Sequence, residues 1–576
     1  MAITIDKPKI EETKKKETKK LSGARIMCEA LVNEGVEIIW GYPGGAIMPF
    51  YDVLPEYPSI HHVLVRHEQG AAHAADGYAR VTGKVGVCVA TSGPGATNLV
   101  TGLATAYMDS VPIVAITGQV ARPFIGHDSF QETDIVGITL PITKHNFLVT
   151  SADSLGEVIH EAFRIAREGR PGPVLIDVPK DVQFEEGEYT PPEKTWEERN
   201  SDNGSAYTDE YIRAARIIDS AQRPLIMAGH GIIISKAYDE LRAFAEKTGI
   251  PVITTLLGLS AFPENHPLAL GMPGMHGPAH VNLAIDEADL IVGVGLRFDD
   301  RVTGNLKEFA PNARFIHIDI DPAEIGKNIK PEVGIVADAK EALAKLTELV
   351  SKKEHSGWLE EIKRREKPER SVMKTTKISP YDVLKAIKKA TNGEARIVTD
   401  VGQHQMWAAR FYGWEKPNSH ISSGGLGTMG YALPAAMGVK AGCPEDPVWV
   451  VAGDGGIQMN IQELGTIVQE NLDIKVAIIN NGYLGMVRQW QEFFHNRNYS
   501  ETRISSPDYS LIATAYGAKG RRVTRKEDVE AAVEWAMSQP GCVILDFEIE
   551  QEANVYPMVP SGGSVKTMIL DPEANE

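Results

Sequence analysis

Short apolar runs alternate with helix-forming stretches along most of the chain, and this alternation restricts the possible folds more than any other feature. Many of the runs are rich in β-branched residues and end in glycine, proline or aspartate, where a loop into a helix would begin. Clear examples are VEIIWGYPGG (36–45), KVGVCVATSGPG (84–95), GPVLIDVP (172–179), ADLIVGVGLRFDD (288–300) and PVWVVAGDGG (447–456). The pattern is typical of parallel, doubly wound sheets, so we expect an α/β protein.

Two polar stretches divide this alternation into three blocks. At 576 residues the chain is too long for a single core. The breaks lie at 185–209 and 351–377. We therefore expect three doubly wound parallel-sheet domains over 21–190, 205–350 and 375–550, a disordered Lys-rich tail over 1–20, and a C-terminal lid or tail over 551–576.

Composition excludes several classes of function. The formal net charge of −18 disfavours binding to nucleic acid or to an anionic membrane. No apolar run approaches the length needed to span a bilayer. The cysteines are scattered in mostly apolar contexts, which indicates reduced thiols and a cytoplasmic protein. They are Cys28, Cys88, Cys443 and Cys542.

One strand ending carries the motif on which the functional prediction depends. The run PVWVVAGDGG contains Gly453, Asp454 and Gly455, and twenty-four residues (456–479) separate it from the pair Asn480 and Asn481. The residues between them predict a helix and then the strand IKVAII. In such a crossover both strand exits lie on the same edge of the sheet, so Asp454 and Asn481 can face one another.

These residues provide hard oxygen ligands. One carboxylate, one amide oxygen and a nearby backbone carbonyl, that of Tyr483, suit Mg²⁺, whose remaining positions would go to phosphate oxygens. Gly455 allows a diphosphate to approach the backbone, and the following helix supplies amide donors. An Asp-Gly pair alone would also fit a surface turn, but the spacing and the strand–helix–strand context favour a Mg²⁺–diphosphate site.

The same segment resembles the diphosphate-binding motif of thiamine-diphosphate enzymes, and the resemblance extends from Leu21 to about Met558. The first block resembles the pyrimidine-binding domain of that superfamily, the middle block its central domain, and the last block its diphosphate-binding domain. The stretch RHEQGAAHAADGYAR resembles the one that carries the catalytic glutamate, which would be Glu68.

A glutamate at this position suits thiamine chemistry. The cofactor forms its reactive C2 carbanion through its own 4′-imino group, for which N1′ of the pyrimidine ring must receive a proton. Glu68 follows the apolar run HHVLV and precedes small apolar residues, so burial would favour its protonated form. Taken alone, Glu68 would better fit a solvated acid at the start of a helix.

Within the superfamily, the chain most resembles the catalytic subunits of acetohydroxyacid synthases, also called acetolactate synthases. The resemblance implies that pyruvate loses CO2 and that the hydroxyethyl–thiamine enamine attacks pyruvate or 2-oxobutyrate. The products would be 2-acetolactate or 2-aceto-2-hydroxybutyrate, intermediates towards valine, leucine and isoleucine. The matching stretches are GYPGGAIMPFYD, SFQETDIVGITLPITKHN, GRPGPVLIDVPKDVQ, GMHG, RFDDRVTGN, SSGGLGTMGYALPAA and GMVRQWQEFF.

The resemblance implies roles around thiamine diphosphate for residues of the last block. Gln403 and His404 would lie near the diphosphate. The carbonyl of Gly427 would hold the 4′-amino group, and Met429 would wedge between the two rings of the cofactor. Met429 would otherwise be a core residue, and His404 could support its neighbours without touching the cofactor.

A second cofactor, FAD, is also implied by the resemblance. Acidic residues at strand ends suit contacts with ribose or adenine, although each alone would pass for an ordinary loop residue. Because the reaction is non-redox overall, this FAD would be structural or vestigial. The matching residues are Arg170, His276, Arg297, Asp319 and Asp338.

Further matches concern the substrate. Met486 and Trp490 are four residues apart on one helix face, beside Arg488, and Trp490 would favour 2-oxobutyrate over pyruvate as second substrate. A tryptophan on an apolar face is otherwise commonly buried in a core. Lysine and arginine side chains along the channel could attract a 2-oxo acid carboxylate. The residues matching the family's active-site channel are Phe130, Gln131, Lys180, Asp300 and Arg301.

The resemblance also implies protein partners. In this superfamily the two halves of the cofactor site come from different subunits, so we expect a homodimer, or a dimer of dimers, with sites at the interface. We expect no valine-sensing domain of the family in this chain, because the residues after Met558 are too few to form a domain. We therefore expect a separate regulatory small subunit.

Two other functions remain open on the sequence. A pyruvate oxidase, or another thiamine-diphosphate-dependent decarboxylase or carboligase such as a flavin-free catabolic acetolactate synthase, would share the thiamine motifs. Oxygen consumption and a flavin spectrum distinguish these enzymes. A flavin-binding electron-transfer or nucleotide-sensing protein would lack thiamine, which the combination of Glu68 with the Asp454 motif disfavours.

Overall fold

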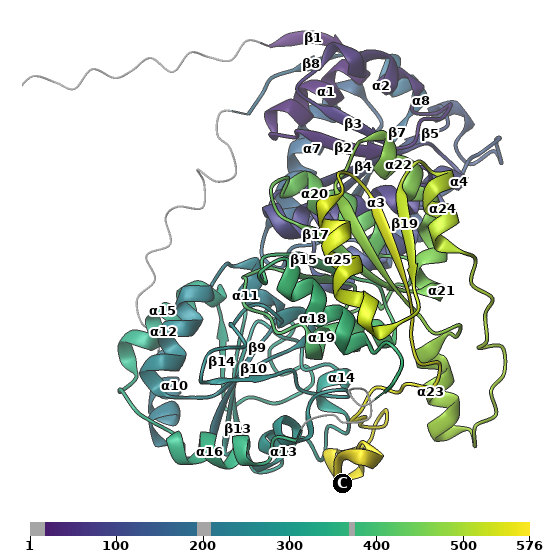
Figure 1. Ribbon diagram of the computed structural model, residues 1–576. Helices are drawn as coiled ribbons and strands as arrows, with labels where there is room; N and C mark the ends of the chain where they lie inside the picture. The colour runs from purple at the N-terminus through teal and green to yellow at the C-terminus, as the bar shows by residue number, and fades with distance from the viewer. Residues whose placement is uncertain (1–17, 193–208, 368–374, 576) are drawn as a thin grey trace, which may run out of the picture.

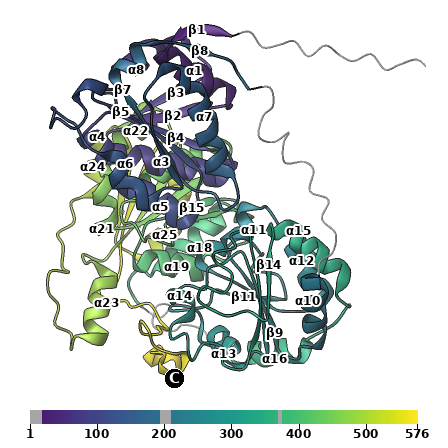
Figure 2. The same cartoon turned by 180° about the vertical axis from the view of Figure 1, so that it is seen from behind.

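The computed structural model describes residues 18–192, 209–367 and 375–575. Over these residues the chain forms three six-stranded parallel sheets flanked by helices (Figure 1). The expected α/β class, with three doubly wound parallel sheets, is therefore confirmed. The first sheet lies at the top in Figures 1 and 2, the central sheet lies below on one side, and the third lies against both.

The first and third sheets share one topology. Their strand orders are β3-β2-β4-β5-β7-β6 and β16-β15-β17-β18-β20-β19, so in both sheets the order reverses beside the first strand. The first sheet comprises β2 (Ile38–Gly41), β3 (His61–Leu64), β4 (Gly86–Ala90), β5 (Ile113–Gln119), β6 (His145–Leu148) and β7 (Val174–Pro179). The third comprises β15 (Arg396–Thr399), β16 (His420–Ser422), β17 (Val448–Gly453), β18 (Ile474–Asn480), β19 (Lys519–Val523) and β20 (Val543–Glu548).

The central sheet has a different order, β11-β10-β9-β12-β13-β14. Numbered within the sheet this is 3-2-1-4-5-6, the order of dinucleotide-binding folds, whose ligand crevice lies where the first and fourth strands meet. Its strands are β9 (Pro224–Ala228), β10 (Val252–Thr254), β11 (Ala269–Gly271), β12 (Leu290–Val294), β13 (Arg314–Asp319) and β14 (Val333–Val336).

Helices cover both faces of each sheet. Their apolar sides pack on strands that are buried along almost their whole length, as in β5 and β18. The longer helices are α1 (Gly23–Asn33), α3 (Glu68–Thr82), α5 (Val100–Asp109), α7 (Ala152–Arg167), α10 (Asp209–Ser220), α12 (Tyr238–Thr248), α13 (Ala279–Glu287), α15 (Ala339–Leu349), α16 (Ser356–Arg364), α18 (Pro380–Ala390), α19 (Gln403–Phe411), α20 (Ala432–Gly442), α23 (Gly485–Phe494) and α25 (Val529–Ser538).

The structure corrects the expected tail and connections. Lys19 and Lys20, expected in a disordered tail, belong to β1 (Lys19–Ser22), which pairs antiparallel with β8 (Glu186–Tyr189) at the start of the first polar connection. In the second connection, α16 buries Trp358 and Ile362 against the central domain. The remaining parts of these expectations, 1–17, 193–208 and 368–374, lie outside the described residues.

The C-terminal segment packs against the central domain, beside α13 and α14 (Asp300–Thr303) in both views (Figures 1 and 2). The Val559 amide donates to the Met275 carbonyl and the Asn305 amide to that of Gly563, at 2.8 and 2.9 Å. The role of this segment as a lid stays a prediction.

The first and third domains are joined by close packing of α3 on α20. Gly77 faces the Ala435 carbonyl and Gly438 faces the Ala74 carbonyl, so that a Cβ at either glycine would collide with backbone. The two helices can approach this closely only because these positions lack a side chain.

A buried ionic network lies beside this helix pair. Arg80 Nε donates to Asp76 Oδ1 at 2.6 Å, and its Nη2 donates to Asp109 Oδ2 at 2.8 Å. The Tyr431 hydroxyl donates to Asp76 Oδ1 at 2.5 Å from the third domain. The Arg80 side chain is 4% exposed and both carboxylates are fully buried, so solvent does not screen these contacts.

In the part of the chain that the structure covers, none of the helices combines the length and apolar character that a membrane crossing requires.

We predict that Arg80→Ala lowers the free energy of unfolding by about 3–5 kcal/mol, because it leaves two buried carboxylates without their cation. Urea denaturation followed by tryptophan fluorescence measures the change. The matched control is Arg25→Ala, which breaks the exposed pair with Glu56 and should change stability by less than about 1 kcal/mol. Equal effects of the two substitutions would contradict a special role for the Arg80 network.

Candidate functional site

The motif residues Asp454 and Asn481 meet at the carboxyl edge of the third sheet. β17 and β18 are neighbours with Gly453 paired to Ile479, so that Asp454 and Asn481 follow strands ending side by side. Both line a small cavity of about 60 Å³. The other predicted thiamine and metal residues that line it are Gln403, His404, Met429, Gly455 and Tyr483.

Asp454 lies at the start of α21 (Asp454–Ile457) and is 1% exposed. Its Oδ2 accepts hydrogen bonds from the Gly482 amide at 3.1 Å and from Ser506 Oγ at 2.8 Å. Burial raises the pKa of this carboxyl group, and among the described residues no lysine or arginine forms an ion pair with it. A divalent cation would supply the missing positive charge, and a carboxylate, an amide oxygen and a carbonyl suit Mg²⁺.

The cavity wall also fits a diphosphate. A Cβ at Gly453 would lie 2.9 Å from His404 Nδ1, and one at Gly455 would lie 2.8 Å from Leu484 Cδ2, so the wall has no room for side chains here. His404 Nε2 is buried and has no hydrogen-bond partner within the described residues. Burial lowers the pKa of His404 to about 3, so the ring is neutral and carries a single proton.

Gln403 is held firmly beside this cavity. Its Nε2 donates to Gln489 Oε1 at 2.8 Å and to the Ala553 carbonyl at 2.9 Å, while its Oε1 accepts from Asn481 Nδ2 at 3.3 Å. The side chain of Asn481 is therefore oriented by Gln403.

Gly427 and Met429 lie on the loop that follows β16. Gly427 has a φ of +71°, in the left-handed region that glycine adopts without strain. A Cβ at Gly455 would lie 3.7 Å from Met429 Cε, so this loop borders the Asp454 cavity.

Two residues that support this site were missed from the sequence. Asp400 accepts from the amides of Val401 and Gly430 at 2.8 and 3.0 Å, and burial raises its pKa to about 6. Ser506 orients Asp454. Asp400 directly follows the strand residues ARIVT (395–399), so its position at a strand exit was a usable signal. No pattern in the sequence distinguishes Ser506.

Glu68 is the first residue of α3 and is 8% exposed. Its Oε2 accepts from Asn98 Nδ2 at 2.8 Å. A Cβ at Gly95 would lie 3.2 Å from Glu68 Oε1, and one at Gly93 would lie 2.8 Å from the Gln131 carbonyl. Glu68 and Gln131 therefore border the same turn at the carboxyl edge of the first sheet.

Lys180 lies at the same edge, because it follows β7 directly and begins α8 (Lys180–Phe184). Neither Glu68, Gln131 nor Lys180 lines the Asp454 cavity. The described chain thus contains two half-sites, one at the carboxyl edge of each outer sheet, and does not bring them together.

A larger cavity, of about 550 Å³, lies at the central sheet and between the three domains. Its wall includes His230, which follows β9, and Gly295, which follows β12, so it occupies the crevice where the strand order reverses. All five residues predicted to bind FAD line it: Arg170, His276, Arg297, Asp319 and Asp338.

These five side chains have different environments. Arg170 donates to Glu324 Oε1 at 2.7 Å and to Ser110 Oγ at 2.8 Å. Burial raises the pKa of Asp319 to about 6 and lowers that of His276 to about 4, so His276 is neutral. Asp338 accepts from the Lys340 amide at 2.9 Å as the N-cap of α15, which gives it a structural role as well.

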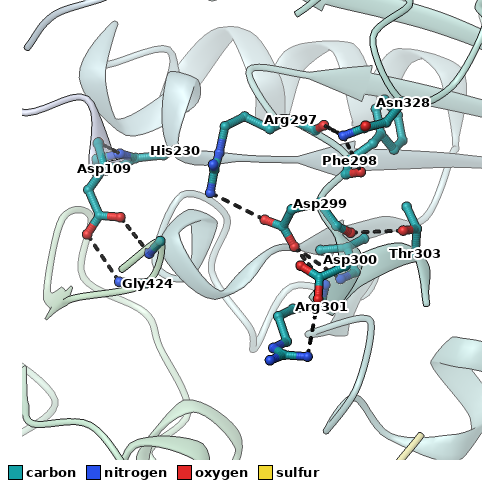
Figure 3. A network of polar contacts seen from close by, with 12 residues as sticks. Asp109, His230, Arg297, Phe298, Asp299, Asp300, Arg301, Thr303, Asn328 and Gly424 are labelled. Carbon is teal, nitrogen blue, oxygen red and sulfur yellow. Dashed lines mark hydrogen bonds and ion pairs between the residues drawn. The ribbon is translucent and has the colours of Figure 1, made fainter. Parts of the chain in front are cut away.

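Arg297 faces Asp299 across 3.5 Å, next to Asp300 and Arg301 (Figure 3). Asp300 and Arg301 also line the larger cavity and pair with each other at 3.2 Å. The sequence missed Glu324, Asp109 and His230 among the lining residues, because no short motif surrounds them.

Met486 and Trp490 of α23 also line the larger cavity. Trp490 contacts Phe494 with ring centroids 5.3 Å apart. Arg488, between them in sequence, is fully buried and donates to Glu492 at 2.9 Å and to Asn554 Oδ1 at 2.7 Å. Arg488 therefore anchors the C-terminal segment.

Comparison with known proteins identifies the three domains. The family model for the N-terminal TPP binding domain of thiamine pyrophosphate enzymes matches residues 21–138, that for their central domain matches 212–346, and that for their C-terminal TPP binding domain matches 400–547.

Relatives with curated names are similar over nearly their whole length. The acetolactate synthase large subunit of Corynebacterium glutamicum is 48% identical over 95% of this chain and 89% of its own. That of Pyropia yezoensis is 48% identical over 95% of both chains, and the acetolactate synthase of Mycobacterium leprae is 47% identical over 97% of this chain and 92% of its own.

Thiamine diphosphate, which the sequence predicts, is the ligand in the descriptions of two matching domain models. Mg²⁺ and FAD, the other two predicted cofactors, are typical of this group of enzymes. The chain therefore belongs to the acetolactate synthase large-subunit family of thiamine pyrophosphate enzymes.

Proposed function

We propose that this chain joins two 2-oxo acids as the catalytic subunit of an acetolactate synthase. Pyruvate loses CO2, and its remaining two-carbon unit is added to the carbonyl of pyruvate or 2-oxobutyrate, giving 2-acetolactate or 2-aceto-2-hydroxybutyrate. The observation that supports this most is that Asp454 and Asn481 meet at one strand edge, close to a cavity lined by all five predicted flavin residues.

Bound thiamine diphosphate supplies the nucleophilic carbon and takes up the electron pair that remains when CO2 leaves. The chain's own residues hold the cofactor. Asp454, Asn481 and the carbonyl of Tyr483 would bind Mg²⁺, which neutralises the diphosphate charge. Gln403 and His404 would lie beside the diphosphate, and Gly455 would present bare backbone to it.

Glu68 would hold a proton at N1′ of the pyrimidine ring, where a carboxyl group in hydrogen-bonding reach can share it. The Gly427 carbonyl would accept from the 4′-amino group. Met429 would press between the rings of the cofactor. These roles require both half-sites to face the same cofactor.

We propose a homodimer, or a dimer of dimers, in which the first domain of one subunit completes the Asp454 site of the other. Large apolar side chains are exposed at both half-sites, as expected for surfaces that are covered on assembly. At the first sheet these are Tyr42, Met48, Phe124, Phe130 (88% exposed) and Phe184, and beside the Asp454 site they are Leu426, Met459 and Val487.

Substrate would enter beside the larger cavity. Lys180 and Arg301 would attract the carboxylate of an incoming 2-oxo acid, and Gln131 would supply a polar contact. Met486 and Trp490 would form the apolar contact for the second substrate. Because several relatives are called large subunits, we also propose a separate regulatory small subunit. The unpaired thiols Cys28, Cys88, Cys443 and Cys542 support a reducing compartment, the cytoplasm.

The direct test is incubation with pyruvate, Mg²⁺, thiamine diphosphate and FAD, followed by assay of acetolactate. We predict product from the unaltered chain and a loss of about 10²- to 10⁴-fold in kcat for Glu68→Gln, because the amide cannot exchange a proton with N1′. Glu37→Gln, which alters an exposed pair with Lys84, is the control and should retain activity. No acetolactate from a cofactor-loaded protein would overturn the proposed function.

We predict that Asp454→Ala removes Mg²⁺-dependent binding of thiamine diphosphate, because it deletes the one anionic ligand of the proposed set. Loss of residues that merely orient metal ligands costs about 10- to 100-fold in affinity, so loss of a ligand should cost more than this. Titration calorimetry with and without Mg²⁺ measures the effect. Asp473→Ala, at the opposite end of β18, should bind normally. Unchanged binding by Asp454→Ala would leave Asp454 as a turn residue.

We predict that the chain prefers 2-oxobutyrate over pyruvate as second substrate, and that Trp490→Leu removes most of this preference. One methylene in an apolar pocket contributes roughly 10- to 200-fold in discrimination. Quantifying both products from one mixture gives the ratio. Phe494→Leu, which alters the ring that contacts Trp490 edge-on without lining the cavity, is the control. An unchanged ratio in Trp490→Leu would show that the ring only packs.

A further inference from the structure

Asp109 connects all three domains of the chain. It is the last residue of α5 in the first domain and is 1% exposed. Its Oδ1 accepts from the Gly425 amide at 2.6 Å, and its Oδ2 accepts from the Gly424 amide at 3.1 Å. Arg80 holds the same carboxylate from the other side. The side chain therefore fixes the start of the loop that follows β16 in the third domain.

The backbone of Asp109 contacts the central domain. Its carbonyl accepts a hydrogen bond of 2.9 Å from Nδ1 of His230, the first residue of α11 (His230–Ile234) (Figure 3). Burial lowers the pKa of His230 to about 4, so the ring is neutral. Because a carbonyl only accepts, the single ring proton lies on Nδ1.

The loop held by Asp109 is a wall shared by the two proposed cofactor sites. Residues 423–427 of this loop line the larger cavity, together with Asp109 and His230. Met429, two residues later, lines the Asp454 cavity. Between them, Thr428 Oγ1 lies 2.7 Å from Thr105 Oγ1 of the first domain, which is a second anchor.

We propose that Asp109 is a positioning residue that couples the two cofactor sites: an occupant of the larger cavity orders His230 and, through Asp109, the loop that carries Gly427 and Met429. The inference rests on the proposed function, in which FAD fills that cavity and thiamine diphosphate contacts the loop. A flavin would thus act on a non-redox reaction by fixing the geometry of the thiamine site.

The physical basis is conformational entropy. A ligand that orders a shared wall removes part of the cost that the second ligand would otherwise meet, so the second binds more tightly. The coupling is reciprocal, because each cofactor must change the affinity of the other by the same factor. Coupling of this kind distinguishes a positioning role from simple packing.

The test measures the dissociation constant of thiamine diphosphate, in excess Mg²⁺, with and without saturating FAD. Circular dichroism reports thiamine diphosphate, and quenching of flavin fluorescence reports FAD in the reverse titration. In the unaltered full-length protein FAD should tighten thiamine diphosphate binding within the range of known couplings, about 5- to 150-fold. In His230→Phe, which lacks the donor to Asp109, the factor should fall towards unity.

Two variants serve as controls. His230→Asn places an amide donor near the position of Nδ1 and should restore the coupling. His276→Phe removes a different histidine of the same cavity, whose Nδ1 lies 3.4 Å from the Pro557 carbonyl rather than that of Asp109. It should weaken FAD binding while the coupling factor stays as in the unaltered protein.

The outcomes separate this inference from the proposed function. If both cofactors bind the unaltered protein independently, or if His230→Phe keeps the full coupling factor, the inference is wrong and the proposed function stands. If either cofactor fails to bind, both are wrong. Loss of coupling in His230→Phe, with recovery in His230→Asn, supports Asp109 as the connection.

Discussion

The close packing of α3 on α20, with the buried network of Arg80, Asp76 and Asp109 beside it, is the contact on which the rest of the structure depends. Gly77 and Gly438 let the helix backbones touch, and the network then ties the ends of α3 and α5 to the loop that follows β16. Two buried carboxylates share one guanidinium, and with the Tyr431 hydroxyl and two backbone amides each of their four oxygens accepts at least one hydrogen bond. Such a network is stable only when every member is paired.

The same topological rule positions both cavities. In a parallel sheet, neighbouring connections diverge where the strand order reverses, and the crevice left at the carboxyl ends is open to a ligand. In the third sheet this point lies between β15 and β17, which are followed directly by Asp400 and Asp454. In the central sheet it lies between β9 and β12, which lead to His230 and Arg297. The chain thus uses one architectural feature twice, for a small anionic group and for a larger ligand.

The two proposed sites are neighbours rather than independent modules. The loop after β16 separates them, and Asp109 holds that loop while also binding the histidine of the opposite wall. This arrangement gives a physical meaning to a flavin in a reaction that transfers no net electrons.

The sequence by itself determined the class of fold and the local chemistry. The alternating strands and helices predicted parallel sheets, and the spacing from Asp454 to Asn481 was enough to place them on one edge, because a single crossover relates their strands. Tertiary structure alone decided which distant segments meet: the order of strands in the central sheet, the packing of α3 on α20, the pairing of Lys19 with Tyr189, and the contacts of Asp109 and Ser506. Those contacts join residues far apart in sequence. They depend on how strands, helices and domains pack together, which periodicity and local motifs do not encode.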